Sequence, residues 1–570
     1  MAIKLYPVVI VGAGISGIAM ACQLKQKLGL SDFIIFDRHG GIGGTWHINK
    51  YPGVACDVPA LLYSFSFAPN YGWTSLFPPG HEIVEYLRDV CSKFGITDHI
   101  KLNTEITEAR WCEAEEEWEL TLTHLVEHSG DLSAADRRAR ARENGEASVY
   151  LGSERVRAKV LISCVGGLVE PKAWPSDVKG VESFQGPIFH SARWDDRVDL
   201  TDKKVLVVGS GCSASQLVPC LTQAPYHAKS VMQIMRSPPW VNPRPATPRL
   251  WRKYSWRILS NVPGLGKLLR FLLFLGAESF WLLFGQSDAS AKRRKRFEAR
   301  LLNHMEKTVP EKYRGMLVPD YPAGCKRTVL DGQWLECLND ANVELTLRPL
   351  RSVQAMSVTL GPGPVDSTEE KANETVEVPA DVIVLANGFD TANYLHSLKV
   401  TGIGGKSLQA TWEERGGPHA YLGLGVDQFP NFFLILGPNT LSGHSSAILA
   451  SENAVSYILN FVPGILSGEV RTVQVKTSAL LEYTADVQAR TKTKIWPKCH
   501  SWYVGNSGWN SAVCPYSQIH FTLMCMFPKW QHWDITYTQK GLATRRLRRR
   551  ATYLLLVTVA LLGTIWRLWK

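Results

Sequence analysis

The residues with the clearest chemical meaning are the glycines of two short turns. Gly12, Gly14 and Gly17 follow a run of apolar, mostly β-branched residues. Glycines at this spacing let a strand turn tightly into a helix whose N-terminus faces a pyrophosphate. Asp37 ends the next apolar run, twenty residues after Gly17. A carboxylate there binds ribose hydroxyls and repels a 2′-phosphate. This segment therefore predicts a dinucleotide site for an unphosphorylated ribose, as in FAD.

A second turn of the same design lies further along the chain. It consists of Gly209, Ser210, Gly211, Cys212, Ser213, Ala214 and Ser215. The apolar run that follows it ends in Arg236 and Ser237 instead of an acid. A guanidinium beside a hydroxyl suits the 2′-phosphate of NADP. Two sites with opposite ribose preferences imply hydride transfer from NADPH to FAD.

A loop dense in glycine, proline and aromatic residues follows Asp37, at residues 43–57. This composition predicts an ordered loop, not a long helix or strand. Such a loop can wrap a flat ring system; the alternative is a surface loop pinned by its aromatic side chains.

The elements that must position these residues predict an α/β protein with two Rossmann-like dinucleotide-binding domains. We expect the first part of the FAD-binding domain at 1–180 with an antiparallel meander at about 101–165, the NADP-binding domain at 181–380 with a helical segment at about 240–316, the second part of the FAD-binding domain with a substrate-pocket segment at 381–540, and a basic stop with a membrane anchor at 541–570. Buried strands are expected at 160–167 and 381–390, where apolar runs end in glycine, and both are expected to rejoin the first domain; 432–439 holds a further buried strand.

Three further segments have an unusual composition, and two of them have an alternative interpretation. Residues 127–147 are charged and poor in large apolar residues, which predicts a flexible excursion. The very apolar stretch 268–285 is interrupted by Arg270 and Glu278, so a core helix is expected, with membrane contact as the alternative. The basic run 292–296 predicts a solvated helix face, with a membrane or phosphate patch as the alternative.

The net charge of +11 suggests nucleic-acid binding, but residues 541–570 hold seven of the basic residues and no acid. The rest of the chain is nearly neutral, which argues against a nucleic-acid-binding protein. Twelve cysteines occur without a Cys-x-x-Cys motif, so we expect no metal site and no redox dithiol, and the simplest interpretation is reduced cysteines in the cytosol.

The end of the chain changes character after an arginine-rich run at 545–550. Residues 551–566 are uncharged and mostly apolar, and as a helix they would span roughly 24 Å, close to the thickness of the endoplasmic reticulum bilayer. Tyr553, Trp566 and Trp569 sit where interfacial aromatic residues belong. We expect a single-pass C-terminal anchor with the catalytic body in the cytosol; the alternative is an amphipathic or packed terminal helix.

One further motif carries a family resemblance. Phe184, Gly186, His190 and Trp194 have the spacing F-x-G-x-x-x-H-x-x-x-W, which resembles the fingerprint of type I Baeyer–Villiger monooxygenases, class B flavoprotein monooxygenases; the resemblance covers roughly residues 7–535. It implies that NADPH reduces FAD and that one oxygen atom of O2 enters a carbonyl substrate, giving an ester or lactone. Relatives that oxygenate nitrogen or sulfur are the nearest alternative. A flavin disulfide reductase and a membrane-tethered binding protein with vestigial sites are further alternatives.

The resemblance also implies roles for single residues. Arg327 matches the active-site arginine and Asp57 the carboxylate that positions it, while Lys326 and Arg236 match contacts to the 2′-phosphate. His190 matches a histidine that couples domain motion. The implied FAD contacts are Thr45, Trp46, His47, Ile48, Asp57, Tyr63 and Ile106, and the implied NADP contacts include Ala55, Cys56, Asp57 and Arg327. The segment 499–503 resembles one found near the substrate pocket.

Overall fold

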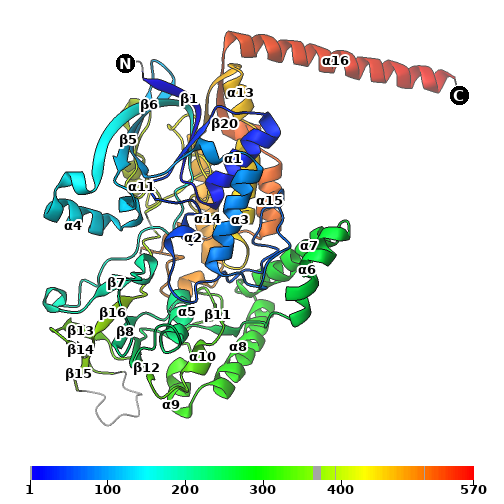
Figure 1. Cartoon of the computed structure of the whole chain (residues 1–570). Coiled ribbons are helices and arrows are strands. Elements are labelled where there is room, and N and C mark those ends of the chain that lie inside the picture. The colour runs from blue at the N-terminus through cyan, green and yellow to red at the C-terminus, as the bar shows by residue number, and fades with distance from the viewer. Residues whose placement is uncertain (1–2, 364–373, 392, 506, 570) are drawn as a thin grey trace.

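Two sheets built around parallel strands form the frame of the molecule, the first above the second in Figure 1. The computed structural model describes residues 3–363, 374–391, 393–505 and 507–569. The first sheet has the order β17-β4-β5-β6-β1-β2-β3, with β18 beside β6. Its strands are β1 (Lys4–Val11), β2 (Ile34–Phe36), β3 (Ile100–Lys101), β4 (Thr104–Cys112), β5 (Glu117–Leu125), β6 (Tyr150–Ser163), β17 (Lys399–Thr401) and β18 (Phe432–Leu434).

The first strand lies in the middle of this sheet, as its apolar run predicts. β1 pairs in parallel with β2 and β6, and Val8, Val9 and Ile10 are fully buried. The chain then turns at Gly12 (φ +105°), where a Cβ atom would lie 2.7 Å from the carbonyl oxygen of Cys164. Only glycine fits this close approach, and it delivers the chain to helix α1.

The antiparallel meander is confirmed, since β4 pairs with β5 and β5 with β6 in antiparallel register. The prediction of a flexible excursion at 127–147 is wrong. It contains helix α4 (Ala134–Asn144), capped by Ser133, and the buried Arg137 donates two hydrogen bonds to Glu105 on β4, at 2.7 and 3.1 Å. One buried ion pair and a cap thus order a segment that lacks large apolar residues.

The second sheet has the order β12-β9-β8-β16-β7. Its strands are β7 (Ile188–His190), β8 (Lys204–Val208), β9 (Ser230–Ile234), β12 (Val343–Thr346) and β16 (Val382–Leu385). Our assignment of 381–390 to the first domain is therefore wrong, because β16 pairs in parallel with β8 and β7. The chain rejoins the first sheet only at β17.

Helices and small sheets complete both halves. The helices are α1 (Ile15–Leu28), α2 (Thr45–Ile48), α3 (Gly80–Lys93), α5 (Cys212–Leu221), α8 (Asp288–Thr308), α9 (Glu311–Arg314), α10 (Trp334–Cys337), α11 (Leu408–Glu414), α12 (Ala447–Ile458), α13 (Val462–Leu466), α14 (Thr477–Lys492) and α15 (Gln518–Met526). The small sheets are β10 (Val241–Pro243) with β11 (Val329–Asp331), β13 (Leu350–Val353) with β14 (Ser357–Leu360) and β15 (Val376–Pro379), and β19 (Val470–Val475) with β20 (Trp533–Tyr537). Helix α12, from late in the chain, packs against α1 in the first half, and α15 packs against α12.

The helical segment is confirmed, but its apolar part is not a core helix. Helix α6 (Arg249–Asn261) and helix α7 (Leu265–Glu278), with the turn η6 (Ser279–Leu283), project from the body at the lower right of Figure 1. Leu268, Phe271 and Leu272 are each more than half exposed. The basic run on α8 is largely solvated; only Arg294 is buried, and it donates to the carbonyl oxygens of the preceding turn.

The last helix, α16 (Gln539–Leu568), projects from the body on the same side as α6 and α7 (Figure 1). Within the described residues, no helix taken alone has both the length and the hydropathy needed to cross a bilayer. The helices Arg249–Asn261 and Leu265–Leu283 together have the required length and hydropathy, but they are bent by 115° relative to each other. About half of the side chains after residue 550, Tyr553 among them, lie outside the described part.

Candidate active site

A cavity of about 1220 Å³ lies between the two sheets, and both glycine turns open into it. Ligand pockets usually have about 300–1,000 Å³, so this one is large for a single small molecule. The predicted site residues that line it are Gly12, Gly14, Asp37, Thr45, Trp46, Ala55, Cys56, Asp57, Tyr63, Ile106, Gly209, Ser210, Gly211, Cys212, Ser213, Arg236, Ser237, Lys326 and Arg327. The cavity thus joins the two predicted nucleotide sites.

Asp37 lies against the first glycine turn and accepts a hydrogen bond from it. Its Oδ2 accepts a hydrogen bond from the backbone N–H of Ala13 (2.6 Å), and its Oδ1 lies 2.8 and 2.7 Å from the backbone nitrogen and ring Nδ1 of His39. Burial alone would raise the pKa of Asp37, but His39 and the backbone donors hold it below its ordinary value. The carboxylate is therefore ionised, and Oδ2, which accepts only one hydrogen bond here, keeps a lone pair for a ribose hydroxyl.

The aromatic loop is ordered by hydrogen bonds to distant segments. Trp46 Nε1 donates to the hydroxyl of Tyr63 (3.0 Å), and His47 Nε2 lies 3.0 Å from Asp131, in the segment just before α4. Of the predicted FAD contacts, His47, Ile48 and Gly17 do not line the cavity. A Cβ on Gly17 would lie 1.9 Å from the carbonyl oxygen of Gly12, so this glycine serves the close packing of the turn.

Two cations meet at the second turn. Lys326 Nζ donates to Ser237 Oγ (3.2 Å), lies 4.2 Å above the ring of Tyr321, and faces Arg236. Burial and the nearby Arg236 both lower the pKa of Lys326. Like charges held this close favour an anion between them, so the arrangement fits a phosphate group. Ala214 and Ser215 lie behind the turn and do not line the cavity.

Arg327 and Asp57 form the central ion pair of the cavity. Arg327 Nε donates to Asp57 Oδ2 at 2.7 Å, and its Nη2 lies 2.6 Å from Oδ1. Asp57 raises the pKa of Arg327 far above its ordinary value, and Arg327 outweighs burial to hold the pKa of Asp57 below its own. The guanidinium is thus permanently charged and fixed in orientation, with 30% of its side chain still exposed.

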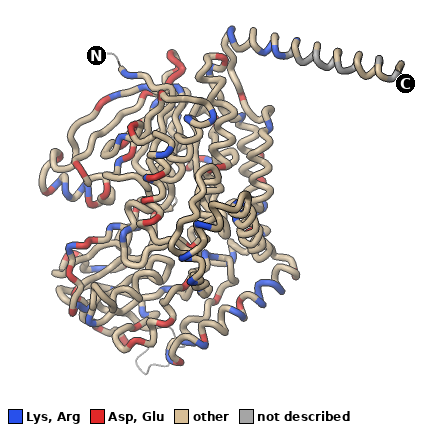
Figure 2. Tube along the Cα trace, turned by 45° about the vertical axis from the view of Figure 1, so that its right-hand side comes forward, with Lys and Arg blue, Asp and Glu red and all other residues tan. Residues whose placement is uncertain are grey.

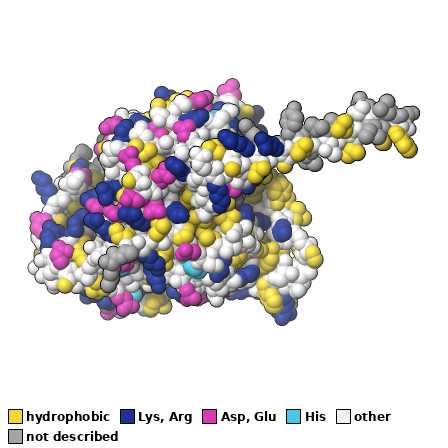
Figure 3. Space-filling view, turned by 90° about the horizontal axis from the view of Figure 1, so that it is seen from above, with side chains coloured by type: hydrophobic (Ala, Val, Ile, Leu, Met, Phe, Trp, Pro, Cys, Tyr) yellow, Lys and Arg dark blue, Asp and Glu magenta, His cyan; other side chains and the backbone are white. Residues whose placement is uncertain are grey.

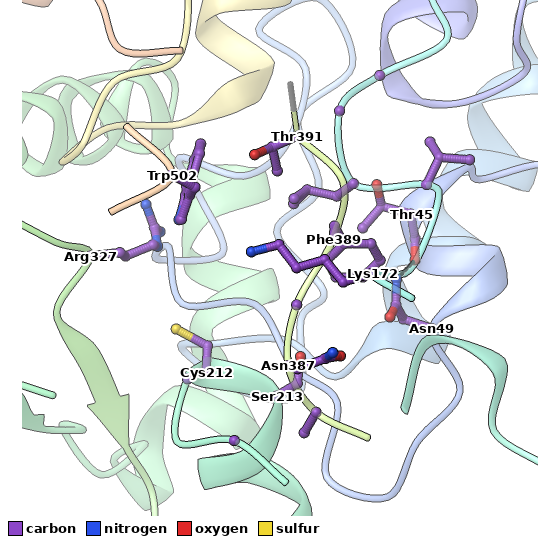
Figure 4. Close-up of a pocket in the computed structure, with 18 of the residues that line it drawn as sticks. Thr45, Asn49, Lys172, Cys212, Ser213, Arg327, Asn387, Phe389, Thr391 and Trp502 are labelled. Atoms are coloured by element: carbon purple, nitrogen blue, oxygen red, sulfur yellow. Dashed lines mark hydrogen bonds between the residues drawn. The ribbon is translucent and has the colours of Figure 1, made fainter. Parts of the chain in front are cut away.

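A disulfide holds the C-terminal pocket segment against this pair. Cys325 and Cys499 are bonded, with their Cα atoms 6.3 Å apart, so our expectation that all cysteines are reduced is wrong for these two. The bond fixes 499–503 beside Arg327, and Trp502 and Tyr503 line the cavity (Figure 4). Burial raises the pKa of Tyr503 to about 12, so its hydroxyl is neutral.

The fingerprint residues stand outside the cavity. Phe184, Gly186, His190 and Trp194 surround the edge of the second sheet. His190 Nδ1 accepts from the backbone N–H of Ala192 (3.0 Å), and its ring lies 6.0 Å from Phe389, which does line the cavity. Burial and Arg193 lower the pKa of His190 to about 4, so the ring is neutral at neutral pH. A neutral ring that packs against Phe389 fits a structural contact between β7 and the cavity wall better than proton transfer.

Sequence reasoning missed residues that join the halves. Gln216 on α5 accepts from the Tyr51 hydroxyl (2.8 Å) and donates to the carbonyl oxygen of Ala55 (3.0 Å), which ties the second turn to the aromatic loop. The side chain of Lys172 extends into the cavity near Phe389 (Figure 4). Neither residue lies in a recognisable motif, so no local signal marked it.

Comparisons with known proteins agree with this geometry. Residues 10–77 match a model described as NAD(P)-binding Rossmann-like domain, and residues 143–259 match one described as flavin-binding monooxygenase-like. The FAD-binding monooxygenase ktnD of Aspergillus niger is 32% identical over 90% of this chain and 79% of its own length. A Baeyer–Villiger monooxygenase of Streptomyces coelicolor is 31% identical over 90% of this chain and 89% of its own.

The chain belongs to the Baeyer–Villiger monooxygenase family of class B flavoprotein monooxygenases. Solved structures share the fold of this family. Cyclohexanone monooxygenase from Rhodococcus sp. Phi1 bound to NADP+ has a TM-score of 0.74 at 23% identity, covering 94% of this chain and 100% of its own. A steroid monooxygenase bound to NADP has a TM-score of 0.73 at 24% identity, with the same coverage. The protein is therefore an FAD- and NADPH-dependent monooxygenase.

Proposed function

We propose that this monooxygenase inserts one oxygen atom of O2 into a ketone and releases an ester or lactone. The observation that carries the proposal is the Arg327–Asp57 pair, which stands in one cavity with both nucleotide turns. A fixed cation is what an oxygen with developing negative charge requires.

The chain's own residues divide the work. FAD, when bound and reduced by NADPH, would supply the oxygen-transfer chemistry. The first turn and Asp37 would hold the pyrophosphate and ribose of FAD, and Arg236 with Lys326 would hold the 2′-phosphate of NADPH. Arg327 stabilises negative charge on the reacting oxygen, and Asp57 fixes its guanidinium in place. Tyr503, neutral and beside Arg327, contributes a hydrogen-bond donor.

A substrate panel tests the proposal. Purified protein is incubated with NADPH, isotopically labelled O2 and a set of ketones, amines and sulfides, and the products are identified by mass spectrometry. We expect labelled esters or lactones from ketones. Oxygenated amines or sulfides with no ester would contradict the proposal and favour the heteroatom oxygenases of the same scaffold.

We also propose that 551–566 anchors the protein in a membrane, with the catalytic body on the cytosolic side, and that the bilayer is that of the endoplasmic reticulum. The support is the uncharged length of this segment and the arginine-rich run before it, which favours the cytosolic face. Full-length protein is expected in the membrane fraction after carbonate extraction. Release by carbonate would contradict the spanning anchor.

A further inference from the structure

Helices α6 and α7 present apolar side chains to solvent. On α6 and the following turn, Leu250, Tyr254, Trp256, Ile258 and Val262 are between 36 and 72% exposed, and on α7 the same holds for Leu268, Phe271, Leu272 and Leu275, at 40 to 54%. Contiguous apolar surface of this extent marks a site of interaction. Figure 3 shows hydrophobic side chains gathered at the end of the molecule from which the C-terminal helix projects.

The inner face of α7 is firmly attached to the body. Arg270 donates to the carbonyl oxygens of Leu61 (2.7 Å) and Ser64 (2.6 Å), and Glu278 lies 2.9 Å from His444 Nε2. Phe274 and Ala277 pack on the main hydrophobic core. These contacts fix the orientation of α7 on the body, so its apolar outer face is exposed in a docked helix.

Helix α15 extends the same surface. The backbone N–H of Ile519 donates to Glu278 at the end of α7 (3.4 Å). From this contact outward, Ile519, Leu523, Met526, Phe527 and Trp530 are 44 to 68% exposed. We define the apolar face as the exposed apolar residues of α6, α7 and 519–530.

The exposed charges on α6 and α7 have one sign. Between residues 249 and 277 there are six basic residues and no acid. Five of them are exposed: Arg249, Arg252, Lys253, Arg257 and Lys267. Blue segments without red mark these helices in Figure 2. An apolar stripe that includes tryptophan, flanked by cations, is the composition of helices that lie in the headgroup region of anionic bilayers.

We propose that the apolar face docks onto the surface of an anionic lipid bilayer, as a second membrane contact that is independent of the C-terminal anchor. The helix α16 leaves the body on this same side, so one bilayer can meet both (Figure 1). A second copy of the chain fits less well, because its identical basic rim would face this one and repel it.

Docking here places lipid near the cavity. A Cβ on Gly443 would lie 3.3 Å from Phe284 and 3.5 Å from the Tyr503 hydroxyl, and the neighbouring Ser442 and Ser445 line the cavity. Phe284 directly follows η6, the end of the projecting pair. Phe284 and Tyr503 are buried, so the projecting pair adjoins the wall of the cavity. Delivery of a bilayer-dissolved ketone to this side of the cavity rests on the proposed function, whereas the docking does not.

The test uses vesicle flotation of two proteins, the full chain and a chain that ends at Leu542. The last residue in the four buried clusters is Ile535, so the shorter chain keeps its core. We expect the shorter chain to float with phosphatidylcholine vesicles that contain phosphatidylserine, and to bind less well without phosphatidylserine or at high salt. If it stays in the soluble fraction with all vesicles, the proposal is wrong.

A matched pair of variants locates the contact. Changing Trp256, Ile258, Phe271 and Leu272 to serine together should weaken vesicle binding of the shorter chain by at least about 10-fold. The control changes Leu151, Val318, Met356 and Leu481 to serine, which are 45 to 70% exposed elsewhere. The control should bind like the parent, and equal binding by both variants would overturn the assignment.

Two further measurements keep the result readable. FAD absorbance and NADPH oxidation report folding of each variant without reference to lipid. If a variant does not fold, the unaltered full chain is used with vesicles that contain a photoactivatable lipid. The lipid should label peptides from 249–283 or 519–530, and labelling of neither segment would contradict the proposal. Sedimentation of the shorter chain should show a monomer, and a dimer abolished by the four-serine variant would identify the apolar face as a self-association surface instead.

Discussion

Arg327 and Asp57 lie 270 positions apart and come from different halves of the molecule, yet they meet with two contacts shorter than 2.8 Å. We expect Arg327→Ala to keep its FAD and its fold but to lose ester formation by about 10²–10³-fold, the usual cost of removing one oxyanion donor. Product analysis under air should show at most that NADPH is oxidised while O2 is reduced to hydrogen peroxide, with little or no ester.

The lysine variant is the control for charge alone. Arg327→Lys keeps a cation but cannot reproduce the two parallel contacts to Asp57, so its ester formation should stay well below that of the parent. Undiminished ester formation by Arg327→Ala would remove Arg327 from the reaction.

The pair also sets an acid limit. The pKa of Asp57 is held below its ordinary value of 3.8, so the carboxylate is ionised throughout the neutral range. A carboxylate whose pKa is lower in the folded than in the unfolded state stabilises the fold fully above its unfolded pKa, and this stabilisation is lost as the pH falls through the folded pKa. The pH profile of ester formation should therefore show no titration of Asp57 above about pH 4. A midpoint between pH 5 and 7 that disappears in Asp57→Asn would contradict this.

Arg236 decides between the two nicotinamide cofactors. Arg236→Ala should raise the KM for NADPH by about 10- to 100-fold, since a hydrogen bond to a charged group contributes about 1.5–3 kcal/mol. The KM for NADH should change little, because NADH has no 2′-phosphate. Steady-state kinetics with both cofactors measures this, and an equal loss with both would place Arg236 elsewhere.

Among the elements, helix α4 is attached to the first sheet by the buried pair of Arg137 and Glu105. Arg137→Ala removes both hydrogen bonds and leaves Arg38, at 3.8 Å, as the remaining cation beside the buried Glu105, so we expect a loss of about 3 kcal/mol in the free energy of unfolding. Arg140→Ala, at an exposed position on the same helix, is the control and should change stability by less than about 0.5 kcal/mol. Chemical denaturation of both variants tests this; equal stabilities would show that the ion pair does not hold α4.

The elements also show what local sequence can reveal. The strand, turn and acid around Gly12 and Asp37 were predictable because their constraints act within about thirty residues. The sheet membership of β16 was not, since an apolar strand of four residues fits the middle of either sheet. Its partners lie far back in the chain, because Ile383 pairs with Leu206 and Ile188. The bond between Cys325 and Cys499 joins segments with no shared motif. The order in α4 rests on the Ser133 cap and the pairing of Arg137 with Glu105, which the composition of the segment does not reveal.

For the whole molecule, the two proposed membrane contacts are separable from the chemistry. A chain that ends at Leu542 should bind FAD and turn over a water-soluble ketone at a rate within about twofold of the full chain, because Tyr503 is the last of the described residues that line the cavity. Turnover of an apolar ketone carried in vesicles should fall in the four-serine variant of the apolar face. Loss of activity on the soluble ketone after truncation would show that the tail supports the fold.

The disulfide between Cys325 and Cys499 closes a covalent ring with 174 positions between its ends, and that ring includes strands from both sheets. A protease that cuts once inside the ring therefore does not divide the polypeptide. The nicked protein should migrate as one band on a denaturing gel without reductant and as two bands with it. The C-terminal tail lies outside the ring on the far side of Cys499, so a nicked molecule would stay attached to whatever the tail holds until a reductant reaches the bond.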